Sequence, residues 1–200
     1  MNVWRDRLHR WFAPMARRFP LSPNAISVLA LIINLAAAWL LYRQHFLIAI
    51  VLLATGGLAD AFDGIVARVQ QKMTRYGDFL DHFADRVSDA ALLTGWLLGN
   101  AVRLEITIAA IIGTLLNGYI GTQIEATWRE RSYDSVGRGE FILALVVFPI
   151  VSHILYDNGW AALAPGGFRI AEWMALLIVV FAILGIVQRF ILAAKLERSR

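Results

Sequence analysis

The sequence of 200 residues contains no cysteine, and only 17% of its positions are charged. Without cysteine the chain forms no disulfide bond and offers neither a thiolate metal ligand nor a thiol nucleophile. Soluble domains normally contain about 25% charged and about 45–50% apolar residues. Here 58% of the residues are hydrophobic, and the mean hydropathy is +0.59. This shortage of charge predicts a protein embedded in a membrane.

The apolar residues are grouped in blocks, and a block of about 20 such residues is long enough to cross a bilayer as a helix. Six blocks approach this length, at residues 25–42, 46–63, 83–101, 104–126, 140–157 and 171–193. They predict an all-α integral membrane protein with six transmembrane helices. We expect residues 23–200 to form this single membrane domain, because the six spans leave no room for a second one.

The first 22 residues differ from the rest, because arginines alternate there with apolar side chains. The apolar positions near helical spacing are Val3, Trp4, Leu8, Trp11, Phe12 and Met15. This pattern is typical of an amphipathic helix that lies on an anionic membrane surface. We therefore expect residues 1–22 to form an interfacial juxtamembrane helix, with a flexible arm as the alternative. An uninterrupted apolar core, which a cleavable signal needs, is missing here.

The distribution of basic residues predicts the orientation in the membrane. If the N-terminus is cytoplasmic and the six spans alternate, sixteen of the nineteen Lys and Arg residues lie on the cytoplasmic side. Cytoplasmic loops carry such an excess in membrane proteins generally. We expect a multi-pass protein of the inner (cytoplasmic) membrane, with both termini and the acidic residues described next on the cytoplasmic side.

Four carboxylates fall within 26 positions, at the cytoplasmic ends of the second and third predicted spans. They are Asp60, Asp63, Asp81 and Asp85. Ionisable groups at membrane depth are costly and usually functional. Carboxylates this close repel one another unless cations neutralise them, and hard divalent cations prefer oxygen ligands. The cluster predicts a metal-dependent membrane enzyme that acts on an anionic substrate.

Helical spacing predicts how these residues meet. If the second span continues through residue 68, one face presents Asp60, Asp63, Gly64 and Ala67. One face of the next helix presents Gly77, Asp81 and Asp85. The polar stretch 69–76 is long enough to turn the chain back between them. Two antiparallel helices would then direct two carboxylates each toward one point, with small residues leaving space for a ligand.

The pattern Asp60-x2-Asp63-Gly64-x2-Ala67-Arg68-x8-Gly77-x3-Asp81-x3-Asp85 resembles the signature of the CDP-alcohol phosphotransferase family at every fixed position and gap. The segment LSPNAIS before the first span and the six-span length are similar to this family as well. The resemblance implies transfer from a CDP-linked alcohol, usually CDP-diacylglycerol, to the hydroxyl of a second alcohol, with release of CMP. It also implies a homodimer.

The resemblance further implies a role for each matching residue. One or two Mg²⁺ or Mn²⁺ ions would be bound by Asp60, Asp63, Asp81 and Asp85. Asp85 would also be the general base that deprotonates the acceptor hydroxyl. The nucleotide would be bound by Asp60, Gly64, Ala67, Arg68 and Gly77. A direct transfer is expected, because no serine or cysteine nucleophile motif is present.

A phosphorylated acceptor is suggested by basic residues after the fourth span and within the last one, since guanidinium groups suit phosphate. The candidates are Arg129, Arg131, Arg138 and Arg189. Members that use inositol phosphate are similar in having a Gln-Arg pair late in the last span, although Phe141 departs from their pattern. Inositol 1-phosphate and glycerol 3-phosphate both remain open as acceptors. A snorkelling side chain is the alternative for Arg189.

Two other functional classes also use clustered carboxylates: intramembrane prenyltransferases and divalent cation transporters. The first normally has two separated Asp-rich motifs, and the second predicts acids at the bilayer midplane with internal repeats. A structural hairpin is the simplest alternative. Among neighbouring residues, Asp78 and Asp89 are expected to have solvent or structural roles, and His82 to point about 100° away from Asp81. Gly95 and Gly99 form a GxxxG pair that could pack within the chain or in a dimer.

Overall fold

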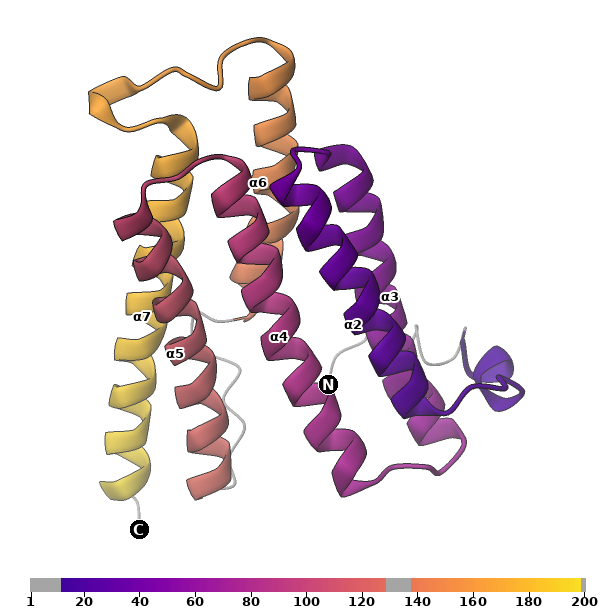
Figure 1. Cartoon of the computed structure of the whole chain (residues 1–200). Helices are drawn as coiled ribbons and strands as arrows, with labels where there is room; N and C mark the ends of the chain where they lie inside the picture. The colour runs from indigo at the N-terminus through magenta and orange to yellow at the C-terminus, as the bar shows by residue number, and fades with distance from the viewer. Residues whose placement is uncertain (1–11, 129–137, 199–200) are drawn as a thin grey trace.

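The computed structural model describes residues 12–128 and 138–198, and every regular element within them is helical (Figure 1). A short helix at 12–17 precedes six long ones: α2 (Pro23–Tyr42), α3 (Phe46–Val69), α4 (Arg75–Gly99), α5 (Leu104–Trp128), α6 (Arg138–Asp157) and α7 (Ile170–Arg198). A 3-10 turn, η1 (Pro165–Gly167), precedes α7. The all-α prediction is thus confirmed, and each predicted span largely coincides with one long helix.

Four of these helices, α2, α3, α5 and α7, are long and apolar enough to cross a membrane. Helix α4 has the length, but acidic and basic residues occupy its first half. The apolar part of α6 within the described residues is the shorter stretch Leu143–Asp157. The protein is therefore a helical membrane protein with four clear candidate spans, and crossing by α4 and α6 stays a prediction.

The helices around the acidic residues extend further than the hydropathy predicts. Helix α3 continues to Val69, and α4 begins at Arg75 instead of residue 83. The start of α4 is fixed by Thr74, whose hydroxyl accepts a hydrogen bond from the backbone N–H of Gly77 at 2.9 Å. The negative charge of Asp78 in the first turn interacts favourably with the positive end of the helix dipole. Local capping thus starts α4 within polar sequence, ahead of its apolar part.

The long helices form two packing groups. Helix α2 packs closely against both α3 and α4, α5 packs along α7, and α6 lies between the groups, with contacts to α3 and α7 (Figure 1). Gly95 and Gly99 of α4 lie so close to α2 that an added Cβ would strike the carbonyl oxygens of Ala38 and Leu41. The GxxxG pair therefore packs within the chain, which answers the question that the sequence left open.

Buried polar contacts join α4 to α6 and the turn before α5 to α7. The indole N–H of Trp96 on α4 donates to the Ser152 hydroxyl on α6 at 3.0 Å, and both side chains are fully buried. At the end opposite the acidic residues, the buried Glu172 of α7 accepts from the Arg103 side chain at 2.8 Å and from the backbone N–H of Arg169 at 2.8 Å. These contacts satisfy polar groups that a lipid environment would otherwise leave costly.

The N-terminal segment packs against α3. Phe12 and Phe19 meet the ring of Phe62 edge-on, with centroid distances of 6.1 and 5.0 Å. The side-chain amide of Gln70 donates to the carbonyl oxygens of Ala16 and Phe19 at 2.9 and 3.0 Å. The helix at 12–17 is therefore anchored to the protein itself, while residues 1–11 of the expected interfacial helix lie outside the described residues.

Candidate active site

A pocket of about 520 Å³ lies between the first turns of α2, the last turns of α3 and the first turns of α4. All eight positions of the spaced signature line it: Asp60, Asp63, Gly64, Ala67, Arg68, Gly77, Asp81 and Asp85. This end of α3 and α4 is also the end at which α7 terminates (Figure 1). The turn at residues 70–74 reverses the chain, as the sequence predicts, so that the two acidic faces oppose each other.

The carboxylates converge closely enough to share a cation. Oxygen atoms of Asp60, Asp63 and Asp81 lie within 4.8 Å of one another. Asp63 and Asp85 are buried, with 6% and 5% of their surfaces exposed. Carboxylate oxygens are the ligands that Mg²⁺ and Mn²⁺ prefer. The residues present therefore fit a hard divalent cation, both in chemistry and in spacing.

One expectation about this pocket is wrong. His82 was expected to point away from Asp81, but it lines the pocket, and one of its ring nitrogens lies within 4.8 Å of carboxylate oxygens of both Asp81 and Asp85. A helical wheel gives the direction of the Cα–Cβ bond, whereas the imidazole extends well beyond it. The same ring lies 3.9 Å from the carboxylate of Asp78.

Helix α2 contributes residues that the motif does not include. The hydroxyl of Ser27 donates to the carboxylate of Asp63. Asn24 lines the pocket, and its side-chain oxygen would lie 3.1 Å from a Cβ added to Gly77. The N-cap of α2 is Ser22, whose hydroxyl accepts from the backbone N–H of Ala25 at 3.2 Å. Asn24 and Ser27 both belong to the segment LSPNAIS, which begins a span at the acidic end of the molecule.

Small residues keep the wall of the pocket open. A Cβ added to Gly64 would meet only the guanidinium of Arg68, at 3.7 Å, which is an ordinary van der Waals distance. The space beside Gly64 is therefore not filled by the protein. This agrees with the expectation that Gly64 and Ala67 leave room for a ligand close to the α3 backbone.

The arginines expected to bind an acceptor do not all fall within the described residues. Arg129 and Arg131 lie outside them, and Arg138 is described only by its place at the start of α6. Arg189 lies on α7 beside Gly121 of α5, and its guanidinium donates to the backbone and side-chain oxygens of Asn117. These contacts hold Arg189 between α5 and α7, outside the set of residues that line the acidic pocket.

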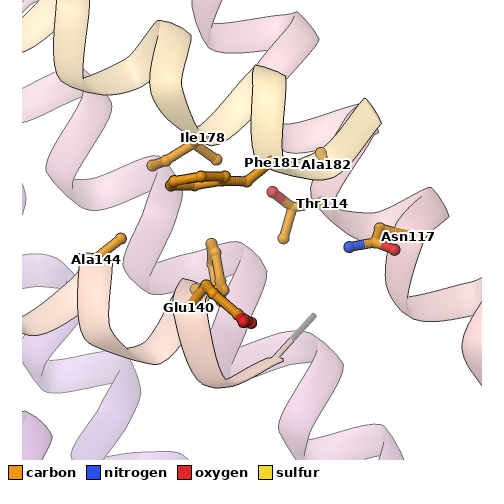
Figure 2. Close-up of a pocket in the computed structure, with 8 residues that line it drawn as sticks. Thr114, Asn117, Glu140, Ala144, Ile178, Phe181 and Ala182 are labelled. Carbon is orange, nitrogen blue, oxygen red and sulfur yellow. The ribbon is translucent and has the colours of Figure 1, made fainter. Parts of the chain in front are cut away.

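A second, much smaller pocket of about 20 Å³ is lined by Asn117, the residue to which Arg189 donates. Figure 2 shows Thr114 and Asn117 from α5 facing Glu140 from α6, with Phe181 of α7 above them. Asn117 thus contacts the pocket on one side and Arg189 on the other. The first turn of α6 is therefore close to Asn117, which binds Arg189 of the last helix.

Arg86, next to Asp85 on α4, also lies against α5. Its guanidinium occupies the place that a side chain at Gly118 would need, and it pairs with the buried carboxylate of Asp89 at 3.6 Å. Arg189 lies about one turn further along α5, beside Gly121. Two guanidinium groups therefore lie along the same face of α5, where Gly118 and Gly121 have no side chain to exclude them.

Membrane-length helices around a pocket of converging carboxylates define a membrane enzyme of the metal-dependent class. The sequence profile of the CDP-alcohol phosphatidyltransferase family matches residues 20–195, which is most of the chain. The protein belongs to this family and is a transferase of this class, as the spacing of its acidic residues predicts.

Several curated relatives are similar to the chain. It is 37% identical over 99 residues to an archaetidylinositol phosphate synthase of Pyrococcus horikoshii, covering 50% of this chain and about half (53%) of that protein. A synthase of the same name from Methanothermobacter thermautotrophicus is 26% identical, with 78% of this chain and 80% of the relative covered. A phosphatidylinositol phosphate synthase of Corynebacterium glutamicum is 27% identical, with 92% and 82% covered.

Solved structures confirm the fold. The phosphatidylinositol phosphate synthase of Mycobacterium tuberculosis with CDP-DAG bound superposes with a TM-score of 0.72, covering 92% of this chain and 94% of that one. A structure of the same enzyme with manganese and citrate gives a TM-score of 0.70, with 90% and 88% covered. Both are 23% identical in sequence, so this likeness concerns the arrangement of the helices.

Proposed function

We propose that the protein transfers a phosphatidyl group from CDP-diacylglycerol to a phosphorylated polar alcohol and releases CMP. The observation that carries this proposal is the pocket lined by all eight signature residues, in which oxygen atoms of Asp60, Asp63 and Asp81 lie within 4.8 Å. The donor that is bound in the Mycobacterium tuberculosis structure supports it. Mg²⁺ or Mn²⁺ is the proposed cofactor, held by these three residues together with Asp85.

In the proposed reaction the acceptor hydroxyl oxygen forms a bond to the phosphorus that carries diacylglycerol. The bond from this phosphorus to the CMP oxygen breaks, and the hydroxyl proton passes to the carboxylate of Asp85. A divalent cation, when bound, neutralises diphosphate charge and stabilises the departing oxygen. Asp85 suits the role of base because it is buried beside the converging carboxylates. General-base catalysis contributes about 10²–10⁴-fold in rate.

The other residues of the pocket are assigned to the nucleotide. Asp60, Gly64, Ala67, Arg68 and Gly77 would bind the cytidine diphosphate moiety, with Arg68 supplying positive charge for its phosphates. Asn24 and Lys72, which line the same pocket, suit this role too. The gap at Gly64 supports the assignment, because it lets a ligand approach the helix backbone.

For the acceptor we favour inositol 1-phosphate over glycerol 3-phosphate. The names of the relatives from Pyrococcus horikoshii and Corynebacterium glutamicum support this choice. Arg189 would bind the acceptor phosphate, joined by Arg129, Arg131 and Arg138 from the start of α6 and the loop before it. The proximity of the first turn of α6 to Asn117, which holds Arg189, supports a shared phosphate site.

The proposed setting is the cytoplasmic membrane, with six crossings in residues 23–200, a juxtamembrane helix in residues 1–22, and the active site and both termini in the cytoplasm. The lipid donor would enter sideways between helices, and the acceptor from the cytoplasm. A homodimer is proposed from the family resemblance.

The experiment that tests this function measures CMP release by the purified protein with CDP-diacylglycerol and Mg²⁺. Inositol 1-phosphate, glycerol 3-phosphate, serine and no acceptor are compared. We expect release to depend on inositol 1-phosphate, to fall about 10²–10⁴-fold in Asp85→Asn, and to need far more acceptor in Arg189→Gln. Dependence on glycerol 3-phosphate instead would overturn the acceptor assignment alone.

Absence of CMP release with every acceptor would contradict the transferase proposal as a whole. Divalent cation flux into vesicles containing the protein, measured in parallel, would then favour the transporter alternative. Release of pyrophosphate from a prenyl diphosphate would favour the prenyltransferase.

A further inference from the structure

Ser27 makes a contact that the spaced motif does not predict. Its hydroxyl donates to one carboxylate oxygen of Asp63, Oδ2, although the two residues are 36 positions apart and belong to different helices. Both side chains are buried, each with 6% of its surface exposed. A buried hydroxyl that reaches a proposed metal ligand from a neighbouring helix is in a position to control that ligand.

The proton balance at Ser27 favours Asp63 as its acceptor. A hydroxyl has one proton to donate, and two acceptors are near: the Asp63 carboxylate and the backbone carbonyl of Pro23, at 3.2 Å. Hydrogen bonds to an ionised carboxylate are shorter and roughly twice as strong as bonds to a neutral carbonyl. The Ser27 hydroxyl therefore donates to the Asp63 carboxylate, and the backbone carbonyl of Pro23 is the weaker alternative acceptor within α2.

The bond fixes how Asp63 faces its neighbours. Because Oδ2 of Asp63 accepts the hydrogen bond from Ser27, the lone pairs that remain for binding a cation together with Asp60 and Asp81 are chiefly those of Oδ1. Substitution of a residue that hydrogen-bonds a metal ligand in this way typically weakens metal affinity about 10–100-fold. Ser27 would thus restrict the Asp63 carboxylate to fewer orientations before a cation binds, so that less conformational entropy is lost on binding.

The position of Ser27 is itself held rigidly. The neighbouring Ile26 is 3% exposed and packs in a cluster with Ala16, Ile65 and Val66. On the α3 side, Phe62 directly precedes Asp63 and is flanked by aromatic rings of the N-terminal segment. The hydroxyl and the carboxylate are therefore carried by backbone segments that pack against each other, so their contact is built into the fold.

We propose that Ser27 is a positioning residue for the metal site, which orients the Asp63 carboxylate for binding a divalent cation. This inference rests on the proposed function, because it assumes that Asp63 is a metal ligand. It predicts an effect on cation affinity in the absence of either substrate.

The test compares Ser27→Thr with Ser27→Val, two side chains of similar volume that differ mainly in the hydroxyl. Binding of Mn²⁺ to the purified full chain is measured from the electron paramagnetic resonance signal of free Mn²⁺, without substrate. We expect Ser27→Thr to bind within about threefold of the unchanged protein, and Ser27→Val about 10–100-fold more weakly. Ser27→Ala, which removes the hydroxyl without adding volume, should resemble Ser27→Val.

Ser88→Ala is the matched control. Ser88 is also 6% exposed, but its hydroxyl accepts from the neutral amide of Asn34 at 3.2 Å. It should leave Mn²⁺ affinity unchanged even if it lowers the thermal midpoint. Equal Mn²⁺ affinity of Ser27→Val and Ser27→Thr would overturn the inference, as would equal affinity of Ser27→Ala and the unchanged protein.

Asp63→Asn separates this inference from the proposed function. If the unchanged protein binds Mn²⁺ and Asp63→Asn weakens binding, the metal proposal stands and the Ser27 variants decide the inference by themselves. If Asp63→Asn binds Mn²⁺ as the unchanged protein does, Asp63 is not a ligand, and both the ligand assignment and the role of Ser27 are overturned.

Discussion

At the residue scale, a substitution at Gly64 should affect substrate binding without lowering the stability of the fold. A methyl group there would contact only Arg68, at 3.7 Å, so the folded chain accommodates Gly64→Ala. We expect its thermal midpoint to stay the same or rise, because alanine favours helix over glycine by up to about 1 kcal/mol. The KM for CDP-diacylglycerol should rise about tenfold, since overfilling a site costs about 1–3 kcal/mol.

The control is Gly57→Ala on the same helix, where an added Cβ has no neighbour within 4 Å. It should leave both the thermal midpoint and the KM close to their original values or slightly raise the midpoint. An unchanged donor KM in Gly64→Ala would mean that the nucleotide binds elsewhere in the pocket.

Spacing alone predicts the residues of the site that share a helix face. Asp60 and Asp63 form one such pair, and Asp81 and Asp85 another, because a helix sets these positions by its period. Spacing does not predict Ser27 or the approach of His82, because these contacts depend on how α2 packs on α3 and on the reach of a long side chain. Contacts between helices are fixed by tertiary packing, which a single sequence does not display.

At the element scale, the close contact between α2 and α4 depends on glycine. In Gly95→Ala the new methyl group would strike the backbone carbonyl of Ala38, which cannot turn aside as a side chain can. The two helices must separate, at a cost of about 1–3 kcal/mol. We expect a clear fall in the thermal midpoint of the purified protein in detergent. Gly57→Ala again provides the comparison, and equal midpoints for the two variants would show that α2 and α4 are not in close contact there.

The lengths of α3 and α4 show where hydropathy fails as a guide to elements. The apolar pattern stops near residue 63 and resumes near residue 83, yet the helices end at Val69 and begin again at Arg75. Between these limits one face of each helix lines the polar pocket, while Ile65 and Val66 pack in a small hydrophobic cluster on another face, so helical structure continues where the apolar run is interrupted. The identity and order of the six long helices could be predicted from hydropathy, whereas the helix ends nearest the site follow from the helical spacing of the acidic residues, which places one helix through residue 68 and the next from Gly77.

At the scale of the whole molecule, the absence of cysteine makes the orientation directly measurable. Lys72, in the turn between α3 and α4, and His45, between α2 and α3, are both exposed. A membrane-impermeant maleimide should label Lys72→Cys only in inside-out vesicles and His45→Cys only in right-side-out vesicles. The reason is the predicted cytoplasmic location of the acidic end.

The protein without cysteine is the background control, and detergent-solubilised samples show that both sites react. Labelling of both variants from the same side would mean that α3 does not cross the membrane. A reversed pattern would place the active site outside the cytoplasm.

The two packing groups of helices have a consequence for how such a protein can diversify. The carboxylates lie on α3 and α4, whereas Arg189 and the small pocket beside it belong to α5, α6 and α7. On the proposed assignment, the chemistry shared by the family and the choice of acceptor are encoded in successive halves of the gene. Changes after residue 104 could therefore alter the acceptor that the enzyme uses, while the residues around the carboxylates stay the same.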